Sequence, residues 1–311
     1  MTDSKIPLSE STLNLFLDEV LDSVKIAIVV LNANYSINII NTGFMNIFGY
    51  KQDELQNRSI DVLFNTEEFK ILQKCMKNAD YSNNLISEEK FELNAIHHNK
   101  TIIPLEITII KSYDDKNPMY IFIMRDIREF KQTIENLKYL AYYDQLTSIP
   151  NRTLFRDRSE TAVRLAGRDK GKLAIVYIDI DNFKIINDTM GHESGDILLK
   201  ALSRRFQECV RDSDTVSRIG GDEFAILMLK ITSLKDASLM VERILKSNLI
   251  PVKINNQDII PKASFGISIY PKDGDNIDTL LKNADAAMYC AKQNGKNQFV
   301  FYKRNMINET N

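Results

Sequence analysis

The stretch RIGGDEFAIL, residues 218–227, decides how the second half of this chain folds. Apolar runs lie on both sides of two glycines and two carboxylates, a pattern that predicts a buried β-hairpin with Asp222 and Glu223 at its tip. A tight turn with solvated acids would have this pattern, and so would a site for a metal ion and a phosphate group. Gly220 and Gly221 carry no side chains, so a ligand could approach the backbone closely there.

A second acidic motif follows the apolar stretch LAIVYIDI, residues 173–180, which is typical of a central strand. The strand ends near Asp179, with Asp181 two residues later. Ligands of open α/β sheets bind beyond the carboxyl ends of strands, and Mg²⁺ prefers one or two carboxylates together with substrate phosphates. Asp179 and Asp222 from neighbouring strands could therefore hold metal ions for phosphoryl transfer. A solvated turn is the plain alternative for the DxD pattern.

The rest of the second half alternates helices and strands. Amphipathic patterns predict helices over residues 153–168, 195–210, 233–248 and 276–295, the last with Gly295 as its C-cap. An apolar run predicts another strand within residues 259–270. This order predicts an α/β domain from residue 144 onward.

The first part of the chain is predicted to consist of short strands mixed with short helices. Residues 25–41 predict two strands around a turn at 32–34, and Ile103, Leu105, Ile107 and Ile109 share one face of a later strand. Helical pieces are predicted within 43–56, a turn at 114–118 and a last strand within 119–127. The result is an α+β domain, an antiparallel sheet with small helices on one side. The length of 311 residues suits two domains better than one, so we expect this α+β domain and the α/β domain in one chain.

A helix over roughly residues 127–142 connects the two parts. Its apolar positions are spaced by 3, 4, 3 and 4 residues, at Ile127, Phe130, Ile134, Leu137 and Ala141. This heptad seam could pair two chains as a parallel coiled coil, or it could pack on its own domain.

Composition limits the possible classes. The net charge of −2 offers no basic surface for nucleic acid. No apolar run approaches the ~20 residues that span a bilayer, and the N-terminal stretch does not resemble a signal peptide. Cys75, Cys209 and Cys290 form no CxxC pair, which favours reduced, buried thiols over a disulfide or a zinc site. We therefore expect a cytoplasmic protein.

Residues 144–303 resemble the GGDEF domain of diguanylate cyclases, which join two GTP molecules into cyclic di-GMP and release two pyrophosphates. The resemblance rests on five motifs in the family's order: DQLTSIPNR at 144–152, DIDNFKIIND at 179–188, GHESGD at 191–196, RIGGDEF at 218–224 and MYCAKQNGKN at 288–297. It implies a sheet like that of the palm-type nucleotidyl cyclases, flanked by helices.

The resemblance also implies roles for single residues. Asp179, the Ile180 carbonyl and Asp222 would bind Mg²⁺, or Mn²⁺ in its place, and Asp222 is also the family's proposed base for the 3′-hydroxyl. Lys184 would neutralise charge in the transition state. Further substrate contacts would come from Gly220, Gly221, Glu223, Lys292 and Lys296. The family usually has arginine where Lys296 stands, and lysine lacks the bidentate fork of arginine.

Base choice follows from the same resemblance. Guanine presents an N1–H beside an exocyclic amine, and one carboxylate can accept from both. Asp196 matches the family position that does this, with Asn187 alongside and His192 near the base pocket. Adenine has no such donor pair at that edge, so the resemblance implies specificity for GTP. A cap for Asn187 and a structural hydrogen bond for His192 are the alternatives.

Arg211 and Asp214 form the motif RDSD, with Arg211 nine residues before Gly220. This spacing matches the RxxD site at which cyclic di-GMP inhibits family members, so it implies product inhibition. A helix-end ion pair is the alternative, and such a pair stabilises little at a surface. Ser148 and Ile149 depart from the glycine and leucine that are usual in the first motif.

Residues 13–126 resemble a PAS domain, through the segments 25–41, 44–60 and 122–131. PAS domains bind small ligands, haem, flavin or other PAS domains, and the ligand here is unknown. Cys75 lies outside the cysteine motif of light-sensing flavin domains. His97 and His98 lie in a predicted hairpin turn, where we expect solvated side chains in preference to haem ligands.

These patterns predict a PAS sensor domain at 13–126, a signalling helix at 127–143 and a cyclase domain at 144–303. We expect a homodimeric diguanylate cyclase that is regulated by its PAS domain and its product, with no membrane span and no nucleic-acid partner. The alternatives are a catalytically silent cyclic di-GMP or GTP sensor that acts through a partner protein, a cyclase that uses ATP or mixed substrates, and a DNA-binding regulator.

Overall fold

The structure is a computed structural model that describes residues 26–78, 90–111, 119–304 and 306. The chain divides into two units, residues 1–135 and 136–311. Residues 13–25, which begin the predicted PAS domain, and the predicted turn at 114–118 lie outside the described residues. No helix among the described residues is long and apolar enough to cross a membrane.

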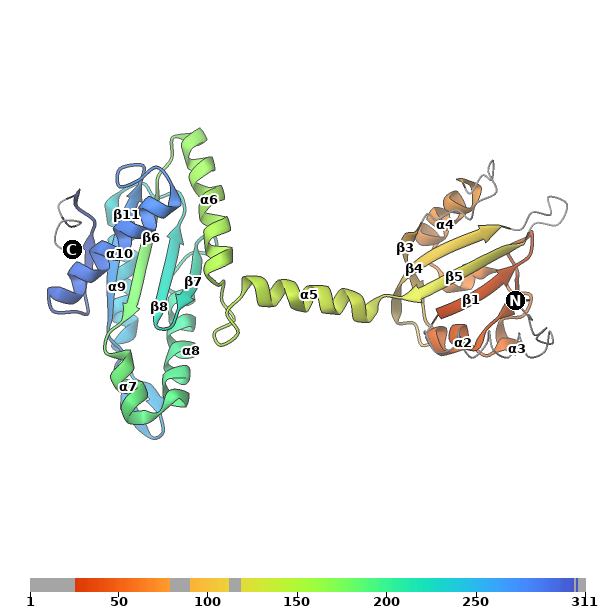
Figure 1. Cartoon of the computed structure of the whole chain (residues 1–311), viewed down its shortest axis with the longest axis horizontal. Coiled ribbons are helices and arrows are strands. Elements are labelled where there is room, and N and C mark those ends of the chain that lie inside the picture. The colour runs from red at the N-terminus through yellow and green to blue at the C-terminus, as the bar shows by residue number, and fades with distance from the viewer. Residues whose placement is uncertain (1–25, 79–89, 112–118, 305, 307–311) are drawn as a thin grey trace, which may run out of the picture. The chain divides into compact units, whose positions relative to one another are not determined.

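The first unit is built on a five-stranded antiparallel sheet in the order β2-β1-β5-β4-β3. Its strands are β1 (Ile26–Leu31), β2 (Ile37–Ile40), β3 (Phe91–Ile96), β4 (Ile102–Lys111) and β5 (Tyr120–Asp126). Short helices accompany the sheet (Figure 1): α2 (Thr42–Phe48), α3 (Gln52–Leu55), the 3₁₀ turn η1 (Ile60–Leu63) and α4 (Thr66–Asn78). The predicted antiparallel sheet with small helices is confirmed.

Strand β4 shows why this sheet has a buried face. Ile103, Leu105, Ile107 and Ile109 alternate along it and are all buried, because successive side chains of a strand point to opposite faces. The predicted turn at His97 and His98 joins β3 to β4, and His97 Nδ1 accepts a hydrogen bond from the Asn99 amide at 3.0 Å.

Helix α5 (Arg128–Tyr142) begins one residue later than predicted. None of its residues is buried. Ile127 precedes the helix and is only 4% exposed, so it falls outside the predicted open seam. Phe130 and Leu137, by contrast, are 58% and 59% exposed.

The second unit contains a five-stranded mixed sheet in the order β12-β11-β6-β8-β7. Its strands are β6 (Leu173–Ile180), β7 (Thr215–Gly220), β8 (Glu223–Met228), β11 (Ala263–Tyr270) and β12 (Phe299–Phe301). All pairs are antiparallel except β11 with β12. A separate hairpin, β9 (Val252–Ile254) with β10 (Gln257–Ile259), was not predicted.

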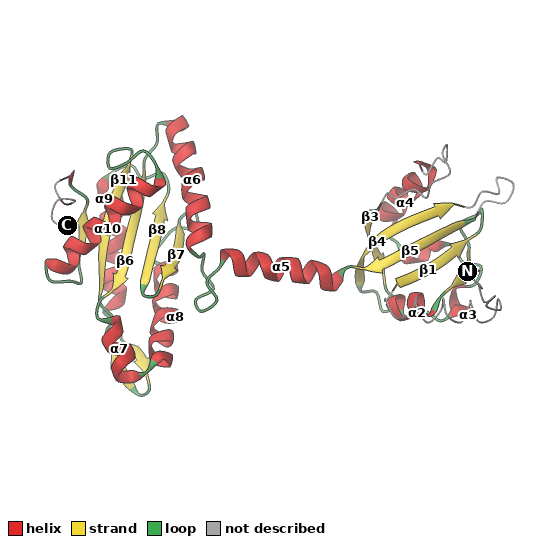
Figure 2. Cartoon of the chain, in the orientation of Figure 1, coloured by secondary structure: helices red, strands yellow, loops and turns green. Residues whose placement is uncertain are grey.

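Helices cover both faces of this sheet (Figure 2). One face packs against α6 (Arg152–Asp169) and α10 (Ile277–Gln293), and the other against α8 (His192–Glu208) and α9 (Leu234–Asn248). The predicted helices are confirmed with small shifts, since α8 starts three residues earlier and the C-cap of α10 is Asn294. Gly295 follows that cap with a φ of +110°.

The alternation of β6 determines which face carries its polar residues. Ile175 packs on the side of α6 and α10, whereas Val176 packs on the side of α8 and α9. Tyr177 and Asp179 continue the row of Ile175, so both side chains face α10. A polar group at the end of a buried strand therefore lies directly beneath the last turns of α10.

Candidate active site

The predicted hairpin is formed by β7 and β8, whose last ladder pair is Gly220 with Glu223. Gly221 and Asp222 make the two-residue turn, and Gly221 has a φ of +50°, in the left-handed region that favours glycine. A Cβ atom added at Gly220 or Gly221 would meet nothing within 4 Å. The glycines of this tip therefore border open space instead of packed protein.

The hairpin tip lies next to the end of β6. Asp179 stands opposite Glu223 in the ladder of β6 and β8. One residue further on, the amide of Ile180 lies 3.3 Å from the carbonyl oxygen of Asp222. The structure thus brings together Asp179 and Ile180 from the end of β6 and Asp222 from the turn between β7 and β8.

Helix α10 adds a cation to this group. Lys292 Nζ lies 2.7 Å from Asp179 Oδ2. Burial raises the pKa of Asp179, the Lys292 ammonium opposes that rise, and the charges of Asp222 and Glu223 add to it. Negative charge is therefore concentrated at the end of β6, where a cation is stabilising.

The residues present fit a magnesium ion that is completed by a nucleotide. Within the described part of the chain, no group of three or more His, Cys, Asp or Glu side chains is arranged to hold a metal by itself. Two carboxylates and a carbonyl are hard oxygen donors, and Mg²⁺ usually takes its other ligands from water and substrate phosphates. Asp179, Ile180 and Asp222 form such a partial donor set.

Tyr177 belongs to the same site, and sequence reasoning missed it. Its hydroxyl lies 3.1 Å from Glu223 Oε2 and donates to that carboxylate. Burial raises the pKa of Tyr177, and the charges of Glu223 and Asp285 raise it further, so the phenol stays protonated and can donate. Its place two residues before Asp179 on one strand face was the available signal. We refer to five residues of this site as the strand-end cluster: Tyr177, Asp179, Asp222, Glu223 and Lys292.

A second set of predicted site residues lies on α7 (Phe183–Met190) and the start of α8. Lys184, His192 and Asp196 are exposed, and within the described residues none of these three side chains has a hydrogen-bond or ion-pair partner. Asn187 differs because its Oδ1 atom is buried and also lacks a partner. Below, the helical corner means Lys184, Asn187, His192 and Asp196.

The packing of α7 on α8 explains where Asn187 lies. Gly195 precedes Asp196, and a Cβ atom at Gly195 would come within 2.0 Å of Asn187 Oδ1. Because residue 195 is glycine, the Asn187 amide can lie directly against α8, at the residue that precedes Asp196. A buried acceptor without a partner normally costs stability, which is the pattern expected where a ligand donor completes the site.

Lys296 lies outside the strand-end cluster, in the turn after α10. Its Nζ atom is 2.7 Å from Asn182 Oδ1, directly before α7. Both Lys296 and Asn182 are exposed. The ammonium group of Lys296, which we predicted to bind phosphate, therefore lies between the end of β6 and the helical corner.

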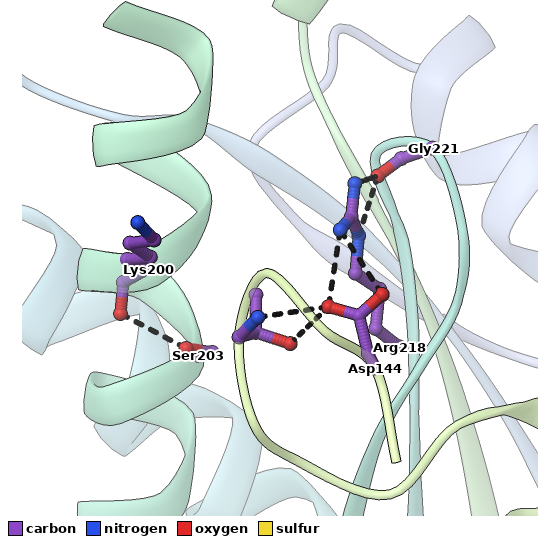
Figure 3. Close-up of polar contacts among 6 residues, drawn as sticks. Asp144, Lys200, Ser203, Arg218 and Gly221 are labelled. Atoms are coloured by element: carbon purple, nitrogen blue, oxygen red, sulfur yellow. Dashed lines mark hydrogen bonds and ion pairs between the residues drawn. The ribbon is translucent and has the colours of Figure 1, made fainter. Parts of the chain in front are cut away.

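A polar network around Arg218 holds the hairpin of β7 and β8 in place (Figure 3). The Arg218 guanidinium donates to both Asp144 oxygens, at 3.1 and 3.2 Å, and to the Gly221 carbonyl at 2.7 and 2.9 Å. Burial opposes ionisation of Asp144, but hydrogen bonds from Thr147 and Arg218 together with the Arg218 charge hold its pKa below the ordinary value. The first and fourth motifs of the sequence therefore meet in one ion pair.

The predicted inhibitory motif forms a closed turn. Asp214 Oδ2 accepts from the Arg211 amide at 3.2 Å, and Oδ1 accepts from the Leu229 amide at 3.0 Å. The Arg211 side chain is exposed. The Asp214 carboxylate thus accepts hydrogen bonds from two backbone amides, while the Arg211 guanidinium remains accessible.

This helix-flanked mixed sheet, with acidic residues on a Gly-Gly hairpin beside its central strand, places the second unit among α/β domains that carry an acidic strand-end site. The chain belongs to the GGDEF family: the family model "Diguanylate cyclase, GGDEF domain" matches residues 141–298. Residues 25–129 match the model of a PAS domain. The predicted order of a PAS domain followed by a GGDEF domain is confirmed.

Relatives from Pseudomonas aeruginosa resemble the second unit. The bifunctional diguanylate cyclase/cyclic di-GMP phosphodiesterase MucR is 41% identical over 167 residues, 54% of this chain and 24% of MucR. Diguanylate cyclase TpbB is 38% identical over 162 residues, 52% of this chain and 37% of TpbB. The chain thus matches well under half the length of these relatives.

A solved structure supports the same assignment. The GGDEF domain of P. aeruginosa PA1120 (TpbB or YfiN) superposes with a TM-score of 0.53 at 36% identity and covers 54% of this chain and 98% of that domain. The similarity therefore spans nearly all of the solved domain.

Proposed function

We propose that this protein is a diguanylate cyclase that condenses two GTP molecules into cyclic di-GMP and two pyrophosphates. The observation that carries the proposal is the meeting of Asp179 and Asp222 beside Lys292 at an open Gly-Gly tip. This concentration of charge at the end of β6 suits the binding of a metal ion together with a triphosphate.

We assign the triphosphate to the cations that surround the end of β6. Lys292 and Lys296 would bind phosphate oxygens as point charges, and Lys184 would neutralise charge that develops in the transition state. The glycines Gly220 and Gly221 would let the ribose and phosphates approach the backbone, with Glu223 beside them. Asp179, the Ile180 carbonyl and Asp222 would hold Mg²⁺ or Mn²⁺, which when bound lowers the pKa of a coordinated hydroxyl and neutralises phosphate charge.

We assign the guanine base to the helical corner. The buried Asn187 Oδ1 has no partner within the described residues, and a guanine N–H donor would satisfy it. The exposed Asp196 carboxylate would accept from the N1–H and the exocyclic amine, with His192 beside the base. This arrangement supports GTP as the substrate over ATP.

In the proposed reaction, each phosphorus–oxygen bond that forms replaces one that breaks. The 3′-oxygen of one GTP attacks the α-phosphorus of the other, its proton passes to Asp222 or to water, and the bond to pyrophosphate breaks. A second, equivalent attack closes the ring. Each domain would bind one GTP, so two domains must face each other.

Helix α5 supports dimer formation. None of its residues is buried, and Phe130 and Leu137 present apolar surface at heptad spacing with Ile134 between them. A signal in the PAS domain would change the pairing of two α5 helices and so change how often two active sites meet. The cytoplasmic location stays a prediction.

Product inhibition would act through Arg211. The accessible guanidinium can bind guanine or phosphate through its planar fork, whereas Asp214 would mainly maintain the turn. Replacing Arg211 with alanine should weaken inhibition by added cyclic di-GMP roughly tenfold without changing the initial rate. An unchanged inhibition curve would remove this assignment.

The deciding experiment is a product assay read by mass. The full chain would be incubated with Mg²⁺ and GTP, and then with equal GTP and ATP. Asp222→Ala would test the site, and Asp258→Ala, which removes an exposed carboxylate from β10, would be the matched control. We expect cyclic di-GMP from the parent and from Asp258→Ala only.

Two other outcomes have clear meanings. Mixed cyclic GMP-AMP would contradict the assignment of Asp196 to guanine. No product, together with saturable cyclic di-GMP binding that is lost in Arg211→Ala, would favour the sensor function over the enzyme.

A further inference from the structure

The two carboxylates of the DxD motif have different surroundings. Asp179 is the next-to-last residue of β6 and faces α10, whereas Asp181 lies just beyond the strand. Both are buried, at 8% and 5% exposed. Asp181 Oδ1 accepts from the Ser264 hydroxyl at 2.8 Å, and Oδ2 accepts from the Asn297 amide at 2.9 Å. Its own amide donates to the Lys262 carbonyl at 2.9 Å. Asp181 is therefore held by protein donors and does not join the strand-end cluster.

These contacts join three strands in the order in which the sheet arranges them. Asp181 follows β6, Ser264 belongs to β11, and Asn297 lies just before β12. The sheet order is β12-β11-β6, so the carboxylate reaches across the start of β11 toward the start of β12. One buried side chain thereby links the end of β6 to the turn that follows α10.

That turn has a backbone that needs support. Lys296 and Asn297 have φ values of +63° and +47°, in the left-handed region that lysine adopts rarely and asparagine more readily. Such conformations persist only where surrounding contacts determine them. The Lys296 amide donates to the Ala291 carbonyl at 3.1 Å, and Asp181 holds the next amide. In this conformation Lys296 Nζ reaches Asn182, next to the end of β6.

We infer that Asp181 is a positioning residue, which holds the turn after α10 so that Lys296 stays at the phosphate site. This role rests on the proposed binding of the GTP triphosphate by Lys296. Asp181 acts through the backbone amide of Asn297. It explains why the DxD motif keeps a second carboxylate that makes no contact with the strand-end cluster.

The first test needs no ligand. Amide hydrogen exchange of Asn297 would be compared in the parent, Asp181→Ala, Asp181→Asn and Ser264→Ala. We expect exchange to speed up at least about tenfold in Asp181→Ala, because the acceptor is lost. Ser264→Ala removes only the neighbouring contact and should leave this amide unchanged. Asp181→Asn retains one acceptor oxygen and should lie between. An unchanged Asn297 amide in both Asp181 variants would overturn the inference.

The second test measures nucleotide affinity. The probe is a GTP analogue with a methylene bridge between its α- and β-phosphates, titrated with Mg²⁺ into each full-length variant. We expect Asp181→Ala to weaken binding about tenfold and Ser264→Ala less than twofold. In a Lys296→Ala background, Asp181→Ala should cost less than twofold, because the two residues act through one contact.

The outcomes separate this inference from the proposed function. If the losses of analogue affinity caused by Asp181→Ala and Lys296→Ala multiply in the double variant, the two residues act independently, and the inferred link between Asp181 and Lys296 is overturned. A parent that binds no analogue would refute the proposed function, while the exchange of the Asn297 amide would still decide whether Asp181 supports the turn. Asp181→Asn keeps both tests available if Asp181→Ala does not fold.

Discussion

The strand-end cluster and the helical corner lie in the same unit but are built in opposite ways. In the strand-end cluster the polar groups contact one another: Asp179 pairs with Lys292, and Tyr177 donates to Glu223. In the helical corner Lys184 and Asp196 are exposed without a side-chain partner among the described residues, and the buried Asn187 oxygen has none either. One region holds its charges in place, whereas the other leaves its polar groups for a ligand.

This difference suggests a division of work. Groups held by fixed contacts need no reorganisation when charge develops, which favours stabilisation of a transition state. Groups without partners gain hydrogen bonds only when a ligand arrives, which favours binding and selectivity. We therefore expect changes in the strand-end cluster to lower kcat, and changes at the base-binding residues of the helical corner, Asn187, His192 and Asp196, to raise KM. Lys184 is the member of the helical corner whose loss should lower kcat, because it would act on the transition state. The following predictions test this comparison, from the largest expected effect to the smallest.

Asp179→Asn should have the largest effect. The amide keeps the shape of the side chain but removes the charge that faces Lys292 and the proposed metal ion. We expect kcat to fall by a hundredfold or more, at about the level seen when a transition-state contact is removed. Steady-state rates over a range of GTP and Mg²⁺ concentrations would measure this. A raised KM with unchanged kcat would contradict the proposed division.

Asp196→Ala should affect substrate choice more than rate. Loss of a charged acceptor for two guanine donors should raise KM for GTP by roughly 10–100-fold. It should also narrow the preference for GTP over ATP, while kcat changes much less. Competition between the two nucleotides, with products separated by mass, would measure both. Glu193→Ala, at an exposed position of the same helix, provides a control that should keep the preference.

Ile134→Asp should separate binding from turnover. The change places a charge in the open seam of α5 and should weaken pairing of two chains. We expect turnover per chain to fall about tenfold at low protein concentration, with affinity for the methylene-bridged GTP analogue unchanged. Gln132→Asp introduces the same charge outside the seam and should resemble the parent. Equal sedimentation and turnover of the two variants would contradict the dimer proposal.

Loss of the Asp144–Arg218 ion pair should have the smallest of these effects, and this effect should be on the stability of the second unit. The pKa of Asp144 is lowered in the folded chain, so this pair stabilises above the ordinary aspartate pKa of about 4, and its contribution is lost as the pH falls through the lowered value. We expect a loss of roughly 1 kcal/mol between pH 6 and pH 3. Asp144→Asn should lack this part of the pH dependence.

Thermal unfolding of the second unit, followed by calorimetry from pH 3 to pH 7, would measure this dependence. Asp258→Asn, at an exposed carboxylate of β10, is the control that should keep the slope of the parent. A parallel pH dependence in Asp144→Asn and the parent would show that the pair does not contribute.

Much of the fold could be predicted because its signals are local. The run of residues 173–180 is apolar throughout and became the central strand β6, and the alternation at Ile103, Leu105 and Ile107 marked the buried face of β4. The hairpin β9–β10 was missed because its strands are only three residues long. The place of Ile127 could not be predicted either, since a heptad pattern does not tell whether a neighbouring sheet already covers a position.

The candidate site divides in the same way. Asp179 and Asp222 could be predicted as chemically suited residues because residue type and position at a strand end are properties of the chain itself. Lys184 and Asp196 were assigned through the resemblance of their motifs to the GGDEF domain. Only the tertiary structure decided that Asp181 turns toward Ser264 and Asn297, and that Tyr177 donates to Glu223. These partners lie 83, 116 and 46 residues apart in the chain. Such contacts depend on strand register and helix packing, so they exist only once the sheet and α10 have come together.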